Sequence, residues 1–60
     1  MLEINNTVAS IISGREGKVV FRGSGTYRGH EVELEADQVL VEFEGSEKPF
    51  LFKECNLIKL

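Results

Sequence analysis

The stretch His30-Glu31-Val32-Glu33-Leu34-Glu35 decides the fold class, because its charged and apolar side chains alternate strictly from residue 31 onward. Successive side chains of a β-strand point to opposite faces. A strand here therefore places Val32 and Leu34 on one face and the three glutamates on the other. Helix signals are nearly absent from the rest of the chain, so the pattern predicts an all-β protein.

A second strand is expected directly after this one. Ala36-Asp37 is expected to turn the chain into a strand over Gln38–Glu44. This loop keeps the two apolar faces together by pairing Val32 with Val41 and Leu34 with Val39. The sequence thus predicts an acidic hairpin that runs from Glu31 to Glu44.

Short apolar runs separated by glycines predict the remaining elements. The expected strands are Thr7–Ser13, Lys18–Arg22, Pro49–Phe52 and Leu57–Leu60, with a tight turn at Gly14–Gly17, a bend at Gly23–Gly25 and a 3₁₀ turn at Lys53–Asn56. Many short strands at this spacing favour a small barrel or sandwich. We expect one domain over residues 1–60, with residues 1–6 as a lead-in.

Strand phase and turn chemistry give expectations for single residues. The predicted core contains Phe21, Val39, Val41, Phe43, Phe50 and Leu57, with Ile11 or Ile12 also pointing inward. Gly14 and Gly17 are expected to supply either positive φ or a close approach of two backbones.

Size and charge limit what the protein is able to do. Sixty residues bury a thin core. The net charge is −3, but residues 1–30 carry +2 and residues 31–60 carry −5. We expect no signal peptide, and the longest apolar runs, such as Val39–Val41, are too short for a membrane span. The single cysteine, Cys55, fits a reducing cytoplasm, where a free thiol most often serves as a small buried hydrophobe.

Two segments carry a family resemblance. Ile11-Ile12-Ser13-Gly14-Arg15-Glu16-Gly17-Lys18-Val19-Val20 resembles the KOW signature, in which a strand leads into a Gly-x-x-Gly-x-Val turn. The order of a middle strand, a short strand, a 3₁₀ turn and a final strand over residues 39–60 is also similar to such barrels. A small photosystem I protein and several very small phage proteins with SH3-like folds share this layout.

The resemblance covers roughly Thr7–Leu60 and implies a small SH3-like barrel of about five strands with one 3₁₀ turn. It departs from the family pattern in two places. Asn5-Asn6 stands where a Gly-Asp pair is usual, and the segment Gly23–Gln38 is longer and more acidic than a minimal KOW connection. The resemblance implies that the turn at Gly14–Gly17 contacts nucleic acid or protein.

Catalysis is not expected. His30 and Cys55 are single, and the chain offers no cluster of metal ligands at local spacing. Gly23-Ser24-Gly25 lacks the Gly-Lys-Ser/Thr ending and the following helix that a phosphate-binding loop needs. A barrel this small also leaves little interior for a carboxylate in an apolar cleft. We therefore expect no enzyme activity, no cofactor and no metal.

The first functional hypothesis is a protein-interaction module of bacterial or phage type that uses the acidic hairpin Glu31–Glu44 or an exposed barrel groove. Its partner-binding residues would be acids that steer a basic protein partner: Glu31, Glu33, Glu35, Glu42 and Glu44. The competing interpretation is that these acids only keep exposed strands soluble and protect their edges.

The second hypothesis is a KOW-like nucleic-acid-binding domain. Its residues would combine cations for phosphate with an aromatic ring for stacking: Arg15, Lys18, Arg22, Tyr27 and Arg28. The negative net charge argues against it, since nucleic-acid-binding domains usually carry excess positive charge. A homodimer through the apolar segments Phe50–Phe52 and Leu57–Leu60 is a further candidate interaction.

Overall fold

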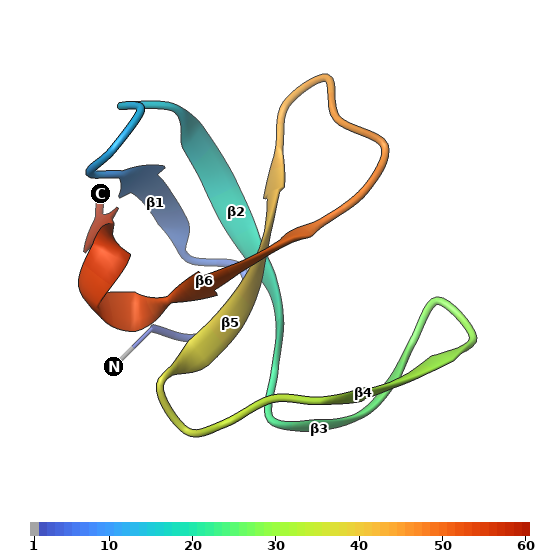
Figure 1. Ribbon diagram of the computed structural model, residues 1–60. Coiled ribbons are helices and arrows are strands. Elements are labelled where there is room, and N and C mark those ends of the chain that lie inside the picture. Colours follow the sequence, from blue (N-terminus) through green and yellow to red (C-terminus); the bar gives the residue numbers. More distant parts are fainter. Residues whose placement is uncertain (1) are drawn as a thin grey trace.

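The computed structural model describes residues 2–60 and contains seven β-strands and one 3₁₀ helix (Figure 1). The elements are β1 (Thr7–Ser10), β2 (Glu16–Arg22), β3 (Ser24–Tyr27), β4 (His30–Glu33), β5 (Gln38–Phe43), β6 (Phe50–Lys53), η1 (Glu54–Asn56) and β7 (Leu57–Lys59). The predicted all-β class and the 3₁₀ turn are confirmed. Residues 2–60 form seven strands rather than about five, because the segment between β2 and β5 forms a hairpin of its own.

The strands form two separate antiparallel sheets. The larger sheet has the order β6-β5-β2-β1-β7, and the smaller is the two-stranded hairpin β3-β4. Over residues 2–60, the edge strands β6 and β7 of the larger sheet do not pair with each other, so the barrel is open. Figure 1 shows the hairpin extending away from the larger sheet.

The predicted pairing of β4 with β5 is wrong. Val32 pairs with Gly25 of β3, whereas β5 lies between β2 and β6. The cause is the two-residue turn Arg28-Gly29, where both residues have positive φ, 52° and 80°. This is the backbone of a type I′ turn, whose twist matches that of two paired strands. The turn pairs β4 with β3, so the chain has already reversed direction before it reaches the predicted turn at Ala36-Asp37.

The core lies on the inner side of the larger sheet. Its buried side chains are Leu2, Val8, Val19, Val39, Val41, Phe43 and Leu57, with Phe52 packed against them. Val39, Val41, Phe43 and Leu57 were predicted to be there. Phe50 was also predicted there but is 48% exposed, and its ring lies at the margin of the core, with its centroid 5.8 Å from that of Phe43.

A β-bulge in β2 explains why Phe21 is not among the buried residues. Val19 pairs with Val41, but the next pair is Phe21 with Leu40, so Val20 is an extra residue on β2. An extra residue reverses the alternation of faces that follows it. Phe21 therefore leaves the core side of the sheet and is half-buried against the hairpin, with its ring centroid 5.7 Å from that of Tyr27.

The first turn differs from the prediction in its position. β1 ends at Ser10, whose buried hydroxyl accepts the N–H groups of Ile12 and Ser13, so the chain turns three residues early. One of Ile11 and Ile12 was expected to point inward, but the two side chains are 54% and 80% exposed. Gly14 adopts a φ of +74°, as a turn glycine does.

Gly17 lies inside β2 and serves the other predicted role, the close approach of two backbones. A Cβ built there would lie 2.8 Å from the carbonyl oxygen of Glu42 and 2.9 Å from Cδ1 of Phe43. The absence of a side chain at residue 17 thus leaves room for the Phe43 ring in the core.

The lead-in packs onto the barrel. The N–H of Leu2 donates to Oε2 of Glu54 in η1 at 2.6 Å, and its carbonyl accepts a hydrogen bond from the Arg22 guanidinium. The side chain of Leu2 is buried in the core. Residues 2–6 therefore help to close one end of the open barrel.

Candidate functional site

The hairpin β3-β4 has two chemically different faces, because residues paired across two strands share a face. One face, the outer face, carries the exposed residues of the pairs Ser24 with Glu33 and Thr26 with Glu31. The other, the inner face, carries the pairs Gly25 with Val32 and Tyr27 with His30. Tyr27 on this face contacts Phe21 and ties the hairpin to the larger sheet.

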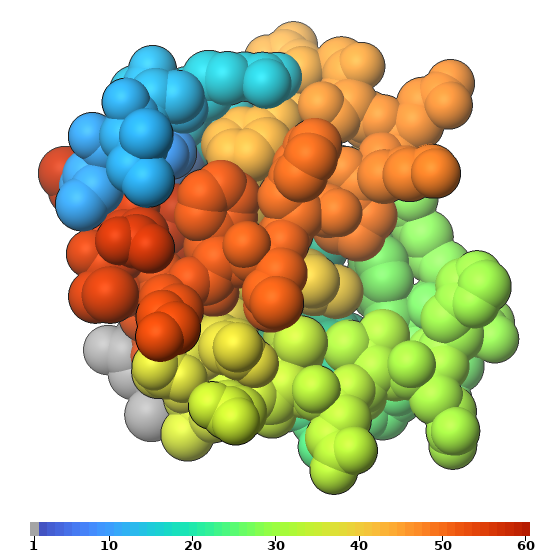
Figure 2. Space-filling model, in the orientation of Figure 1, coloured from blue at the N-terminus to red at the C-terminus, as the bar shows by residue number. Residues whose placement is uncertain are grey.

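A groove of about 380 Å³ lies between the inner face and the larger sheet. We call it the hairpin groove; it is lined by Tyr27, Arg28, His30, Val32, Leu40, Glu47, Lys48 and Pro49. Leu40 reaches it from the side of β5 that faces away from the core, and it pairs with Phe21. Figure 2 shows the hairpin, in green, beside the orange segment that follows β5. The groove combines four apolar residues with charged ones, a composition that suits a peptide side chain.

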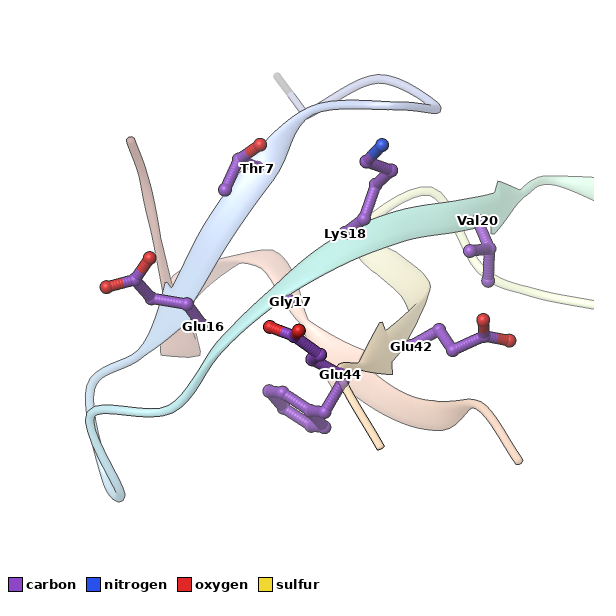
Figure 3. Close-up of a pocket in the computed structure, with 8 residues that line it drawn as sticks. Thr7, Glu16, Gly17, Lys18, Val20, Glu42 and Glu44 are labelled. Carbon is purple, nitrogen blue, oxygen red and sulfur yellow. The ribbon is translucent and has the colours of Figure 1, made fainter. Parts of the chain in front are cut away.

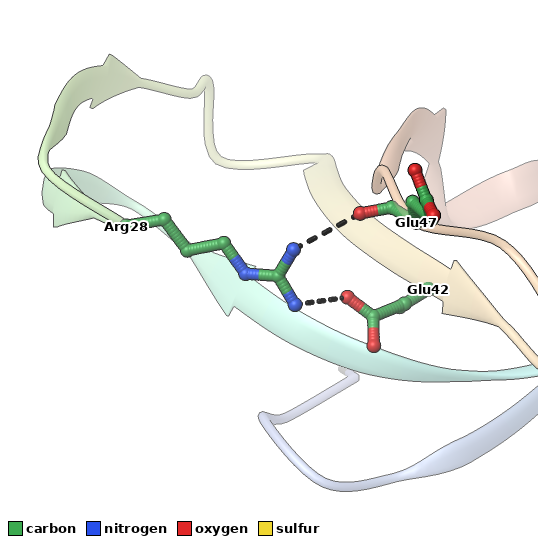
Figure 4. Close-up of polar contacts among 3 residues, drawn as sticks. All are labelled: Arg28, Glu42 and Glu47. Atoms are coloured by element: carbon green, nitrogen blue, oxygen red, sulfur yellow. Dashed lines mark hydrogen bonds and ion pairs between the residues drawn. The ribbon is translucent and has the colours of Figure 1, made fainter.

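Arg28 fastens the tip of the hairpin to the larger sheet (Figure 4). Its Nη2 lies 2.6 Å from Oε2 of Glu42, and its Nη1 donates to the carbonyl oxygen of Glu47 at 3.1 Å. The guanidinium carbon also lies 5.3 Å from the centre of the Tyr27 ring. The side chains of Arg28 and Glu42 are 53% and 31% exposed, so the pair adds little stability. The positive charge of Arg28 nevertheless compensates the negative charge of Glu42.

The five predicted acidic residues separate into three groups. Glu31 and Glu33 lie exposed on the outer face, and Glu35 is exposed in the segment after β4, where its N–H donates to Oε1 of Gln38. Glu42 is paired with Arg28. Glu44 lines a different hollow of about 440 Å³, which Glu16, Lys18 and the paired Glu42 also line (Figure 3).

Glu31, Glu33 and Glu35, which we call the hairpin acids, therefore form the acidic part of the site. Within residues 2–60 none of the three takes part in a salt bridge. Two of these uncompensated carboxylates lie on the projecting hairpin and the third follows β4 directly, and such a group of like charges favours the approach of a cation.

The predicted basic set does not form one surface. The guanidinium carbon of Arg15 lies 4.9 Å from the centre of the Phe43 ring, and Arg22 bonds the Leu2 carbonyl. Arg28 forms a salt bridge with Glu42, and Lys18 of β2 lies opposite Glu42 of β5. Tyr27 is half-buried on the inner face rather than presented for stacking.

The lone cysteine and histidine lie on different elements. His30 begins β4, and Cys55 lies in η1, where its thiol is exposed rather than buried as predicted. In the part of the chain that the structure describes, no group of three or more His, Cys, Asp or Glu residues is placed to hold a metal ion. Nor does any helix among residues 2–60 have the length and apolar character needed to cross a membrane.

The sequence interpretation missed the hairpin groove. Its apolar residues come from separate elements: Tyr27, Val32, Leu40 and Pro49. The one available signal was the phase of Leu40, which lies between the inward-facing Val39 and Val41. Comparison with known proteins finds no matching family model, no matching curated protein and no matching solved structure.

Proposed function

We propose that the chain is a small, non-catalytic protein-interaction module that binds a basic partner through the β3-β4 hairpin. We further propose that it is a cytoplasmic protein of bacterial or phage type, with an open variant of the SH3-like, KOW-type barrel. The order of β5, β6, η1 and β7 supports the barrel assignment, as does the turn that precedes β2. The exposed free thiol of Cys55 supports a reducing compartment.

The observation that carries the proposal is the amphipathic hairpin beside an apolar groove. The outer face presents Glu31 and Glu33 to solvent, while the inner face lines the hairpin groove with Tyr27 and Val32. Charges on a projecting element raise the rate at which an oppositely charged partner associates. The groove supplies the apolar surface that holds the partner after contact.

Nucleic-acid binding has less support. Three of the four cations in the alternative set already have partners within the chain: Arg15 with the Phe43 ring, Arg22 with Leu2 and Arg28 with Glu42. Contacts to a phosphate backbone require several free cations along one surface.

A selection from a random peptide library, displayed on phage, tests the proposal. Wild-type protein is expected to enrich lysine- and arginine-rich peptides, and the variant E31K/E33K/E35K is expected to lose them. The matched control is E3K/E16K/E44K, which reverses three exposed acids outside the hairpin and produces the same net charge. The control variant is expected to enrich the same peptides as the wild type, because its hairpin acids are intact.

Two other outcomes would contradict the proposal. Equal loss in both triple variants would mean that net charge alone governs binding. Salt-dependent retention of the wild type on immobilised RNA or DNA, abolished by R15E/K18E, would support the nucleic-acid alternative instead. Circular dichroism of every variant shows whether it is folded.

A further inference from the structure

The outward edge of β4 has unused backbone hydrogen-bonding groups. In an antiparallel pair, alternate residues bond across the ladder while those between them direct their N–H and C=O groups away. The N–H of Leu34 donates to the carbonyl of Gly23 at 3.1 Å, which fixes the phase along the hairpin. His30 and Val32 therefore bond to β3, and the backbone groups of Glu31 and Glu33 point outward.

No strand occupies this edge within the described chain, because β3 and β4 form a two-stranded sheet. We infer that the edge of β4 accepts an extended segment of the partner protein, which adds as a third strand and alternates basic with apolar residues. This inference rests on the proposed function and specifies the chemistry of the partner. Addition of a strand to an exposed sheet edge is a general mode of peptide recognition.

The pleat of the sheet sets the order of the partner's side chains. When the segment adds antiparallel to β4, a residue that bonds to Glu31 or Glu33 places its side chain on the outer face, next to an uncompensated carboxylate. A lysine or arginine fits there by charge complementarity. The neighbouring residue of the partner lies beside Val32 on the inner face, where an apolar side chain reaches the hairpin groove between Leu40 and Pro49.

The backbone contact and the charge contact are separable by experiment. The probe is a short synthetic peptide that alternates lysine and valine, added to the full chain labelled with ¹⁵N. Hydrogen exchange measured by NMR is expected to slow roughly tenfold or more at the amides of Glu31 and Glu33. The amides of His30 and Val32 are expected to change little, because they already bond to β3.

Three control peptides separate the contributions. A peptide with all lysines placed before all valines keeps the composition and removes the alternation. A peptide that alternates glutamate and valine reverses the charge. A lysine-valine peptide N-methylated at the amides that face β4 loses the backbone donors. All three are expected to bind roughly tenfold more weakly or worse than the probe.

Protein variants complete the test. E31K/E33K is expected to weaken binding of the probe by about tenfold or more, whereas the matched control E16K/E44K leaves it unchanged. If the N-methylated or block-ordered peptide binds as tightly as the probe, or if the Glu31 and Glu33 amides stay unprotected in the complex, strand addition is wrong. The proposed function still stands in that case, provided that E31K/E33K weakens binding. If E31K/E33K does not weaken binding of the probe either, both strand addition and the proposed function are wrong.

Discussion

Replacing Gly17 with alanine is expected to destabilise the protein through steric overlap. Gly17 lies on the core side of β2 and pairs with Phe43 of β5. The added methyl would meet the carbonyl oxygen of Glu42 at 2.8 Å, Cδ1 of Phe43 at 2.9 Å and Cγ1 of Val41 at 2.9 Å. Ordinary contacts of a Cβ are 3.4–4 Å long. The oxygen belongs to the backbone of the paired strand, so it cannot rotate away as a side chain does.

The magnitude follows from the packing of the two strands. Overpacking a core typically costs about 1–3 kcal/mol. Alanine also reduces the conformational entropy of the unfolded chain, which raises the free energy of unfolding by about 0.4–1 kcal/mol. Taking the middle of each range, the net loss is about 1–2 kcal/mol. A small domain of this kind has a free energy of unfolding of only about 5 kcal/mol, so the change removes a substantial share.

Thermal and urea unfolding followed by far-UV circular dichroism measure this loss. The melting temperature is expected to fall by roughly 4–16 °C, and the urea midpoint by about 1–2 M. An unchanged or higher midpoint for Gly17→Ala would refute the packing argument, because it would mean that β5 leaves space for the methyl.

Asparagine separates steric overlap from backbone strain. Gly14 has a φ of +74° and open space around it, so Gly14→Asn is expected to cost little, since asparagine tolerates the left-handed region. Gly17→Asn is expected to be at least as damaging as Gly17→Ala. The opposite ranking would indicate that positive φ, rather than close approach, is what residue 17 requires.

Three further results are expected. Val41→Ala should lower the free energy of unfolding by about 1–3 kcal/mol in a urea melt. Ile12→Ala, at a side chain that is 80% exposed, should change it by less than about 0.5 kcal/mol. A larger loss for Ile12→Ala than for Val41→Ala would mean that the strand register is slipped. Arg28→Ala should cost at most about 1 kcal/mol, and the loss should shrink in high salt; an equal loss at both salt concentrations would exclude an electrostatic cause. Sedimentation equilibrium at high micromolar concentration should detect a dimer that Ile58→Glu disrupts, since Ile58 is 55% exposed on an edge strand; a monomeric wild type would contradict this.

The alternation over His30–Glu35 predicted the faces of β4 correctly and its partner incorrectly. Glu31 and Glu33 are exposed and Val32 is half-buried, as the period of two requires. Alternation does not identify the neighbouring strand, which depends on where the chain reverses. Asn-Gly and Asp-Gly are the usual residues of a type I′ turn, and Arg28-Gly29 carries only the glycine.

The phase of β2 was not predictable from its own residues. Lys18–Arg22 has the pattern of a regular strand, and a bulge leaves no mark in such a short run. The bulge at Val20 moves Phe21 to the hairpin, where its ring packs against Tyr27, one of the residues that line the hairpin groove. The Arg28–Glu42 pair joins residues fourteen positions apart, so no local pattern indicated it.

The hydrogen bond from the Leu34 N–H to the Gly23 carbonyl closes the hairpin at its base. Gly23 directly follows Arg22, which pairs with Val39 of β5, so the segment between β2 and β5 begins and ends beside strands that already pair. A segment closed in this way adds little loop-closure entropy to the folding of the barrel, since the cost grows only slowly with the length of the excursion. The hairpin is therefore exchangeable. A designed hairpin with another edge sequence is expected to be accepted between β2 and β5 while the five-stranded sheet beneath it is kept.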